Sequence, residues 1–257
     1  MSDPAVGRFV WHDLVSADLE ASFRFYSQLF DWGVAEREVG PSSPYTVILA
    51  GDRPIGGIVP LADGLAPNNR WVSYLWVDDV DALAARMIDL GGRVNIPPTE
   101  IPEVGRFAML ADPTGAVLAP FHGTASPPNE PDGEPGTFCW TELLTTDTEA
   151  AAAFYRAICG WTPREIDMGQ LGAYTIFMRG SEDAAGMMQL PADAQDPSSW
   201  LVYVAVEDVD EAAALAEQLE GKIFVKPTDI PTVGRVAVAA DPQGSMFAMV
   251  ALELEAA

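Results

Sequence analysis

The chain repeats itself at a constant spacing of 129 residues. The segment WHDLVSADLEASFRFYSQLFDW (11–32) aligns with WTELLTTDTEAAAAFYRAICGW (140–161), and EIPEVGRFAMLADPTG (100–115) aligns with DIPTVGRVAVAADPQG (229–244), with no gap between them. A period of this length is too long for a solenoid unit, so we interpret it as duplication of a whole domain. The 257 residues are enough for two domains, each with a core of its own.

The stretch between the two copies, HGTASPPNEPDGEPG (122–136), is rich in proline, glycine and acidic residues. This composition is typical of an exposed linker. We therefore expect a first domain over residues 1–122, a linker over 123–136 and a second domain over 137–257.

Hydrophobic periodicity divides each copy into two similar halves. Each half begins with a short apolar strand, continues with an amphipathic helix and ends with three β-rich stretches, which predicts the order βαβββ twice per copy. The first helix has apolar residues at helical spacing from Leu19 to Phe30 and is expected to close at Gly33. In the second copy, Thr146 and Glu149 have the spacing of a capping box, which predicts the start of the matching helix.

Two short signals predict local backbone features. DPTG (112–115) and DPQG (241–244) have the residue preferences of a type I turn, so each is expected to join adjacent strands as a hairpin. Gly56 and Gly57 lack the spacing of a phosphate-binding loop, and we interpret them as a β-bulge.

The charge balance excludes several classes of partner. The chain has 38 acidic and 14 basic residues, a formal net charge of -24. A field of this sign repels nucleic acids and anionic membrane surfaces. The N-terminus shows no signal peptide and no window holds 18 uninterrupted apolar residues, so we expect a cytoplasmic protein. Cys139 and Cys159 lack metal or redox spacing and are interpreted as small core residues.

The four βαβββ units, the helix openings SADLEASFRFY and TTDTEAAAAFY, the segments VDDVDAL and VEDVDEA, and the DPxG hairpins together resemble the vicinal oxygen chelate superfamily of glyoxalases, bleomycin resistance proteins and dioxygenases. The paired WHDL and WTEL openings are similar to the two-domain glyoxalase-like proteins of actinobacteria. The resemblance implies an α+β fold of tandem duplicated glyoxalase-like domains. Their four βαβββ modules would form two open, cup-shaped mixed β-sheets with flanking helices, which we name the first cup and the second cup.

The resemblance also locates the positions at which metalloenzymes of this superfamily hold a divalent cation. On this sequence they fall on Trp11, Val72 and Ala119 in the first copy, and on Trp140, Leu201 and Ala248 in the second. Indole, alkyl and methyl groups provide no ligand for a metal ion. Of the two histidines, His12 is expected to point away from the cup floor and His122 to stand at the linker. We therefore expect no metal and no other cofactor, and no Ser/His/Asp constellation can be assembled.

Strand alternation predicts which side chains line the cups, because residues two apart share a face. Both cups are expected to be apolar and aromatic with one acid each, Asp13 in the first and Glu142 in the second. The candidate ligand-binding residues are Trp11, Tyr74, Trp76, Phe121, Trp140, Tyr203 and Met246. The alternative is that these side chains fill a collapsed cup. Trp76 aligns with Ala205, so the cups differ in free volume, but the sequence does not tell which one is open.

Asp13 and Glu142 are the candidate catalytic residues. A carboxylate on an apolar floor is expected to have a raised pKa and to serve as a general acid or base, or as the anchor of a ligand. The alternative is a structural role, in which each carboxylate is tied to neighbouring groups and holds the halves together. Arg106 and Arg235 follow the VG dipeptide in both copies and are expected to form salt bridges or to bind an anion.

The leading hypothesis is a metal-independent protein that binds or sequesters a hydrophobic or aromatic small molecule, such as an antibiotic or a secondary metabolite. The first alternative is a metal-independent enzyme, an isomerase, lyase or hydroxylase-type tailoring enzyme that uses Asp13 or Glu142 as acid or base. The second is a role in protein interaction that needs neither cup. Two paired domains are compatible with a monomer or a homodimer.

Overall fold

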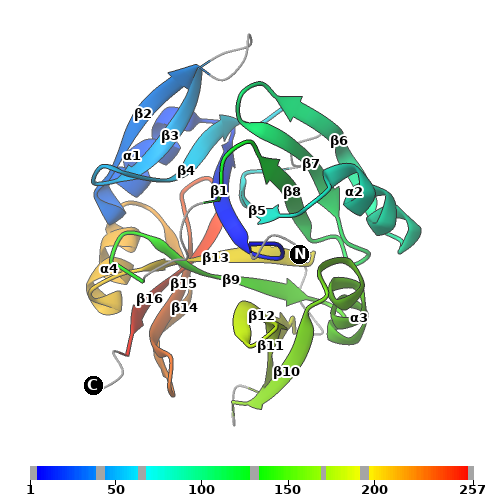
Figure 1. The fold of residues 1–257 in the computed structure, drawn as a ribbon. Coiled ribbons are helices and arrows are strands. Elements are labelled where there is room, and N and C mark those ends of the chain that lie inside the picture. Colours follow the sequence, from blue (N-terminus) through cyan, green and yellow to red (C-terminus); the bar gives the residue numbers. More distant parts are fainter. Residues whose placement is uncertain are drawn as a thin grey trace.

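The computed structural model describes residues 5–38, 44–62, 68–127, 133–168, 172–191 and 197–253. The described residues form four consecutive βαβββ modules, as predicted (Figure 1). The first domain consists of β1 (Phe9–Ser16), α1 (Leu19–Phe30), β2 (Trp32–Glu38), β3 (Pro44–Ala50), β4 (Arg53–Pro60), β5 (Arg70–Trp76), α2 (Val80–Asp89), β6 (Arg93–Ile101), β7 (Gly105–Ala111) and β8 (Val117–Gly123). The second consists of β9 (Phe138–Thr145), α3 (Thr148–Cys159), β10 (Thr162–Asp167), β11 (Ala173–Arg179), β12 (Glu182–Gln189), β13 (Ser199–Ala205), α4 (Val209–Gln218), β14 (Lys222–Ile230), β15 (Gly234–Ala240) and β16 (Met246–Leu252).

Each domain folds into one mixed sheet of eight strands. The strand order is β2-β3-β4-β1-β5-β8-β7-β6 in the first domain, and the second has the equivalent order β10-β11-β12-β9-β13-β16-β15-β14. The two modules of a domain join through one antiparallel pair, β1 with β5 or β9 with β13. The first sheet curls so that β2–β4 and β6–β8 rise on either side of this pair (Figure 1). The predicted cup-shaped, duplicated α+β fold is confirmed.

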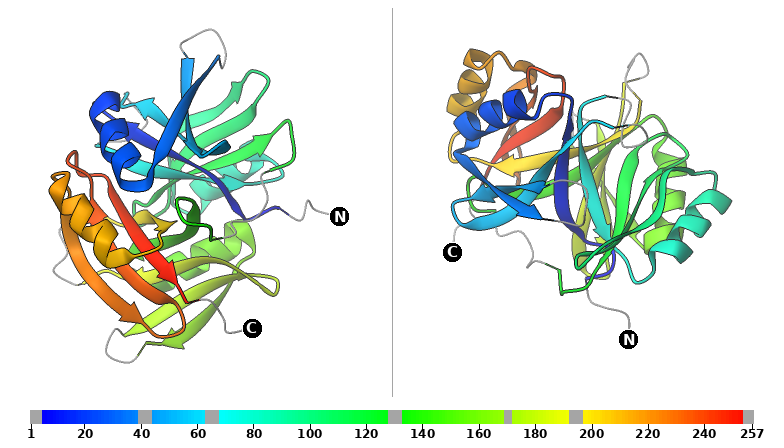
Figure 2. Two further views of the ribbon diagram at one scale, coloured as in Figure 1. Left: turned by 90° about the vertical axis from the view of Figure 1, so that its left-hand side faces the viewer. Right: turned by 90° about the horizontal axis from the view of Figure 1, so that it is seen from above.

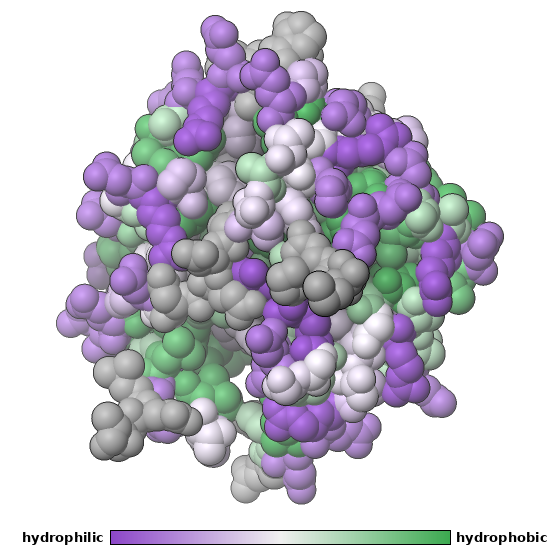
Figure 3. All heavy atoms as spheres, viewed as in Figure 1, coloured by the Kyte–Doolittle hydropathy of each residue, from purple (hydrophilic) through white to green (hydrophobic). Residues whose placement is uncertain are grey.

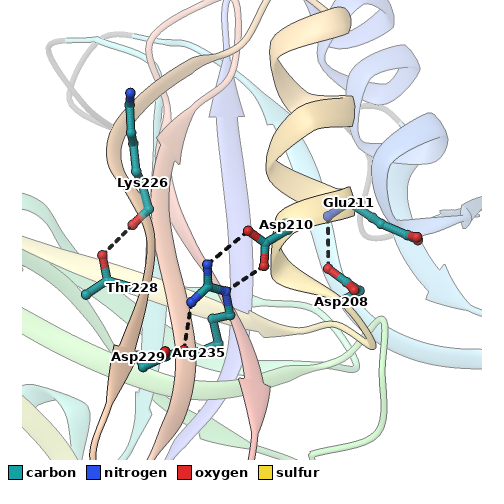
Figure 4. Close-up of polar contacts among 7 residues, drawn as sticks. All are labelled: Asp208, Asp210, Glu211, Lys226, Thr228, Asp229 and Arg235. Carbon is teal, nitrogen blue, oxygen red and sulfur yellow. Dashed lines mark hydrogen bonds and ion pairs between the residues drawn. The ribbon is translucent and has the colours of Figure 1, made fainter.

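An aspartate caps the N-terminus of every helix. The carboxylates of Asp18, Asp79, Asp147 and Asp208 each accept a hydrogen bond of 2.9–3.0 Å from the backbone N–H three residues on; Figure 4 shows the bond to Asp208. The prediction of Thr146 as the cap of α3 was wrong by one residue, because the Asp147 carboxylate satisfies the free amide. The expected end of α1 at Gly33 was also wrong, because Asp31 already adopts the left-handed conformation, with φ 57°, that ends the helix.

The helices pack between the two sheets, and the packing crosses the domains. One core cluster joins the first module to the fourth, where Phe25 and Phe30 of α1 contact Phe247 of β16. A second cluster joins the second module to the third through α2 and α3. Figure 2 shows α1 and α4 side by side. The two concave faces therefore point away from the shared core.

The repeated DPxG motif is a hairpin turn, as predicted, and it also touches the other domain. In the first copy the Gly115 N–H donates to the Asp112 carbonyl at 3.0 Å, which closes the turn between β7 and β8. In the second copy the Gln243 side chain reaches the β1–α1 corner of the first domain, where its amide nitrogen donates to Ser22 Oγ at 2.8 Å and its amide oxygen accepts from Ser16 at 3.0 Å. The turns therefore form part of the domain interface.

The two arginines that follow the VG dipeptide form ion pairs, one of the two expected roles. Arg106 makes a two-pronged contact with Asp81 of α2, at 2.6 and 2.8 Å. Arg235 does the same with Asp210 of α4 and also contacts Asp229 at 2.7 Å (Figure 4). Each pair ties a helix to its sheet.

Residues 128–132, at the centre of the predicted linker, lie outside the described residues, and the exact domain boundaries stay a prediction. Both cysteines are free. In the part of the chain that the structure describes, no helix is long and apolar enough to cross a membrane.

Candidate functional site

A buried carboxylate lies on the concave face of the first sheet. Asp13 on β1 accepts hydrogen bonds from Tyr74 Oη of β5 at 2.8 Å and from Trp11 Nε1 at 3.1 Å. Tyr45 of β3 also donates its hydroxyl proton to Asp13, while its oxygen accepts from Trp11 Nε1 at 2.7 Å. Three strands therefore direct one acid, two phenols and one indole to the same point, which we call the Asp13 cluster.

Burial dominates the electrostatics of this cluster. Asp13 is only 4% exposed. Burial raises its pKa above the ordinary value, because the charged form loses hydration, and the bonds from Tyr45, Tyr74 and Trp11 offset part of that effect. Burial and the nearby charge of Asp13 also raise the pKa of both phenols, so the tyrosines stay protonated and act as donors.

The second sheet repeats the arrangement 129 residues later. Glu142 on β9, which is 4% exposed, lies beside the phenols of Tyr174 on β11 and Tyr203 on β13. Trp140 Nε1 donates to Tyr174 Oη at 3.0 Å. Burial again raises the pKa of the carboxyl, and the two neighbouring phenols lower it in part. We call this group the Glu142 cluster.

A glycine in each copy makes room for the cluster. A Cβ at Gly57 would lie 2.0 Å from Tyr45 Oη and 2.6 Å from Asp13 Oδ1. A Cβ at the equivalent Gly186 would lie 1.8 Å from Tyr174 Oη and 2.8 Å from Trp140 Nε1. The β3–β4 register does shift next to Gly56, as the bulge prediction requires. The greater constraint at Gly57 and Gly186, however, is the close approach of the phenol.

Sequence reasoning found Asp13, Glu142, Trp11, Tyr74, Trp140 and Tyr203 as neighbours, but it missed Tyr45 and Tyr174. These two tyrosines come from a different strand, so alternation along β1 and β5 does not reach them. The signal that marks them is the repeat itself, because YTVILAG (45–51) and YTIFMRG (174–180) align at the same spacing and begin with the same residue.

Of the other predicted lining residues, Phe121 borders the Asp13 cluster, because its ring packs edge-on against Tyr74 with centroids 6.0 Å apart. Trp76 is 3% exposed and stacks edge-on against Phe121, with ring centroids 5.7 Å apart. Met246 lies at the start of β16 and is partly exposed. Trp76 and Phe121 therefore pack together at one end of the first sheet.

Both histidines take the predicted positions. The His12 side chain faces the domain interface, with Nδ1 at 2.9 Å from Ser73 Oγ and its ring against Phe138. Burial lowers its pKa to about 3. His122 lies near the end of β8, with Nδ1 at 2.7 Å from the Val77 carbonyl oxygen. Neither ring is part of a carboxylate cluster.

The two concave faces differ in how far they are filled. In the first, Val15, Met109 and Val117 belong to a buried apolar cluster together with Val72 and Ala119. The side chains at the three equivalent positions of the second concave face are partly exposed: Leu144, Val238 and Met246. Figure 3 shows the molecule hollowed at the lower left, between β14–β16 and β10–β12, with apolar residues gathered there. The second concave face is the more open one.

A crevice of about 220 Å³ opens between the domains. Its lining includes Phe9 and His12 of the first domain, and Arg179, Asp183 and the Trp140 of the Glu142 cluster from the second. Two of its charged groups form ion pairs, since Arg179 contacts Glu182 and Asp183 accepts from Arg164 at 3.1 Å. Neither cluster carboxylate lines this crevice.

The described residues of the concave faces do not supply the set of ligands that a divalent cation needs. At the positions where the resemblance locates metal ligands, the inward side chains are indole, alkyl or methyl groups. Within the described ranges, no three His, Cys, Asp or Glu side chains come together in a geometry that could hold a metal. Each cluster supplies one carboxylate, whereas metal sites of this kind use three or four ligands. The residues present therefore do not fit a resident metal ion.

Two tandem domains, each a curled sheet of two βαβββ modules with a carboxylate on its concave face, define a duplicated, cup-forming class of protein. Residues 8–119 and 137–249 match the family model described as the Glyoxalase/Bleomycin resistance protein/Dioxygenase superfamily, and the chain belongs to this superfamily. The resemblance stated from the sequence is confirmed.

Relatives of similar length come from actinobacteria. The chain is 35% identical over 243 residues to the "Putative glyoxylase CFP32" of Mycobacterium tuberculosis, which covers 93% of this chain and 92% of that protein. It is 32% identical over 262 residues to the "Anthracycline biosynthesis protein DnrV" of Streptomyces peucetius, which covers 96% and 94%.

Solved structures share the fold. The 2,3-dioxygenase LapB from Pseudomonas sp. KL28 aligns with a TM-score of 0.66 at 15% identity, over 97% of this chain and 93% of that one. The Mn(II)-bound glyoxalase from Novosphingobium aromaticivorans aligns with a TM-score of 0.62 at 17% identity, over 97% and 83%. At these identities the likeness is one of fold alone.

Proposed function

We propose that this protein binds a planar, largely hydrophobic small molecule in its second cup without the help of a metal ion. The observation that carries the proposal is the Glu142 cluster, a buried polar group on an otherwise apolar concave face. Small-molecule sites have this makeup, with apolar walls and a few convergent polar groups that fix orientation. Trp140 and Tyr203 add flat aromatic faces on which a planar ligand can stack.

Three further points support the second cup over the first. Val238 and Val236 stand where the first copy has the larger Met109 and Phe107, and Ala205 stands where it has Trp76. The side chains of Leu144 and Met246 remain partly exposed. In this proposal the first cup, filled by its own apolar side chains, has a structural role.

The relatives favour a ligand from secondary metabolism. A protein that is 32% identical over nearly the whole chain is named for anthracycline biosynthesis. We extend to this chain only the class of compound, a polycyclic aromatic metabolite, and propose that the protein binds or sequesters it.

Tryptophan fluorescence tests this proposal. Metal-free protein is titrated with a panel of planar compounds that includes anthraquinones, naphthoquinones and flavones. The proposal predicts saturable quenching with one site per chain. Trp140→Phe should remove most of the ligand-dependent quenching, whereas Trp11→Phe, in the first cup, should retain it. Absence of saturable quenching by the whole panel in folded protein contradicts the proposal.

The raised pKa of Glu142 favours a second candidate, a metal-independent enzyme. A carboxyl with a raised pKa can exchange a proton with a bound ligand, and such an enzyme would be an isomerase, lyase or hydroxylase-type tailoring enzyme. Asp13 has the same electrostatic character but lies in the filled cup. Incubation with ligands found by titration distinguishes the two candidates. Turnover that Glu142→Gln abolishes and Asp13→Asn retains marks an enzyme, whereas binding with no product marks a binding protein.

A further inference from the structure

The edge strand β14 of the second sheet exposes two large apolar side chains in succession. Phe224 is 48% exposed and Val225 is 45% exposed. The β14–β15 register shifts between Ile223 and Val225, so β14 carries an extra residue there. Ile223 packs against the core between the sheets, which turns Phe224, the next residue, to the concave side. Val225 pairs with Val238 on the concave face. The shift therefore places both exposed side chains on the inner wall of the second cup.

The first copy has a different wall at the equivalent positions. Asn95 stands where the second copy has Phe224, and Ile96 stands where it has Val225. Ile96 packs against the buried apolar cluster that fills the first cup. In the second cup the same wall borders the hollow that Figure 3 shows and stays uncovered. An uncovered apolar wall in a concave face is a surface on which a ligand can bury itself.

The same strand carries an unusual positive charge. Lys222 and Lys226 are the only two lysines of the chain, whose net charge is -24. Lys222 pairs with Ala240, and the first-copy equivalent of that residue, Ala111, belongs to the cluster on the first concave face. Lys222 therefore points to the same side as Phe224, and its Nζ lies 4.5 Å from the centre of the Phe224 ring. This is a cation–π contact on the inner wall of the second cup.

The ammonium group of Lys222 can also hold an anion. It forms no ion pair with any residue that the structure describes. A ring face leaves ammonium N–H donors available, and a carboxylate or sulfonate can accept from them. An ionised Glu142 on the floor of the cup repels an anionic group that approaches it. An anionic group on a ligand is therefore favoured at the outer end, beside Lys222.

We propose that Lys222, Phe224 and Val225 form an outer subsite of the second cup, which holds the outer end of a planar ligand and favours an anionic group there. The inference rests on the proposed function, because it requires that the ligand occupies the second cup. It adds the residues that contact the outer end of the ligand and the charge of the group that they favour.

Two anthraquinones that differ only at position 2 test the charge preference. One carries a sulfonate, which stays ionised at the pH of the assay, and the other carries a methyl group. Equilibrium dialysis against the full chain measures both affinities at about 20 mM and about 300 mM salt. Salt screens the attraction to Lys222, so the ratio of the sulfonate affinity to the methyl affinity should fall about threefold. Repulsion by the whole acidic chain acts in the opposite direction, and a constant or rising ratio overturns the inference.

Two lysine variants change the net charge by the same amount and locate the effect. Lys222→Gln should lower the affinity for the sulfonate about threefold and leave the affinity for the methyl compound unchanged. Lys226→Gln lies about 13 Å further along the strand and should change neither affinity. Equal losses of sulfonate affinity in the two variants would indicate a general effect of charge and contradict the inference.

Phe224→Asn, which copies Asn95 of the first cup, tests the aromatic wall. It should lower the affinity for both compounds at least about fivefold, because the ligand loses a stacking partner. Phe224 is about half exposed, so urea unfolding should show the stability of the unaltered chain. Unchanged affinity for both compounds overturns the inference and leaves the proposed function standing. Saturable binding of neither compound to the unaltered chain counts against both.

Discussion

The hydroxyl of Tyr155 on α3 donates a 2.9 Å hydrogen bond to the buried carboxylate of Asp112. Asp112 is the first residue of the DPTG turn in the first domain, whereas Tyr155 belongs to the second, so the bond crosses the domain interface. The same phenol accepts from Trp200 Nε1 at 3.1 Å. The turn that most clearly marks the repeat in the sequence therefore also joins the two copies.

Removal of this hydroxyl should weaken the interface. Tyr155→Phe leaves the Asp112 oxygen and the Trp200 N–H without their partner, and we expect the free energy of unfolding to fall by about 2–3 kcal/mol. Tyr26→Phe is the matched control. Tyr26 faces Asp241, whose Oδ2 is buried without a hydrogen-bond partner among the described residues, so only the 3.1 Å bond from Trp71 is lost. The expected loss there is about 1 kcal/mol. Urea unfolding measures both, and an equal or larger loss for Tyr26→Phe contradicts this account.

His12 should make stability depend on pH. Its folded-state pKa is lowered to about 3 from an ordinary value of 6.5. Below pH 6.5 the unfolded chain therefore binds a proton that the folded chain does not, and the stability contributed by neutral His12 is lost as pH falls. Single-site linkage gives a loss of about 2 kcal/mol between pH 7 and pH 5. His12→Thr, which copies Thr141 of the second domain, should show a shallower decline. If the free energies of unfolding of the two proteins fall by the same amount between pH 7 and pH 5, a buried neutral histidine is ruled out.

The sequence predicts the fold well because the two copies can be compared with each other. Two copies that differ at most positions keep the same apolar periods and the same DPxG turns, so one βαβββ pattern explains both. The details that fail are local. A helix start depends on which of two neighbouring polar residues meets the free amide, and Asp147 does so in place of Thr146.

Substitution of Gly186, beside Tyr174, should affect ligand binding, whereas substitution of Gly57, beside Tyr45, should affect stability. Gly186→Ala displaces Tyr174 from Glu142, and we expect ligand affinity to fall at least about tenfold through loss of the pre-organised cluster. Gly57→Ala creates the same clash with Tyr45 in the filled cup. It should destabilise the protein by about 1–3 kcal/mol and leave affinity unchanged. Titration and urea unfolding of both variants check this, and loss of binding in Gly57→Ala alone would place the site in the first cup.

One exchange between the copies tests which cup is open. Val238→Met introduces into the second cup the side chain that fills the first at Met109. It should reduce ligand affinity several-fold by occupying free volume, with little effect on stability because Val238 is partly exposed. The reverse change, Met109→Val, leaves a cavity at a position whose side chain is only 1% exposed. It should lower the free energy of unfolding by about 1–2 kcal/mol without altering ligand affinity. The opposite pattern of effects would mean that the first cup holds the ligand.

The candidate site was harder to predict than the fold. Alternation along single strands correctly placed Asp13 with Trp11, and Glu142 with Trp140. Tyr45 and Tyr174 come from strands whose contact depends on how the sheet curls, and no local pattern encodes that curl. The difference in filling between the cups likewise depends on side chains from opposite walls, such as Met109 and Val238, that meet only in the folded domain.

The central claim is that the second cup binds its ligand through stacking and the Glu142 cluster, with no cation. Calorimetric titration of the tightest-binding compound of the fluorescence panel into chelator-treated protein, with the metal content of the same sample measured, tests it most directly. The account predicts one saturable site per chain, with an affinity that added Mn²⁺, Zn²⁺ or Mg²⁺ does not change. Loss of binding on chelation and its return with one equivalent of metal would contradict it.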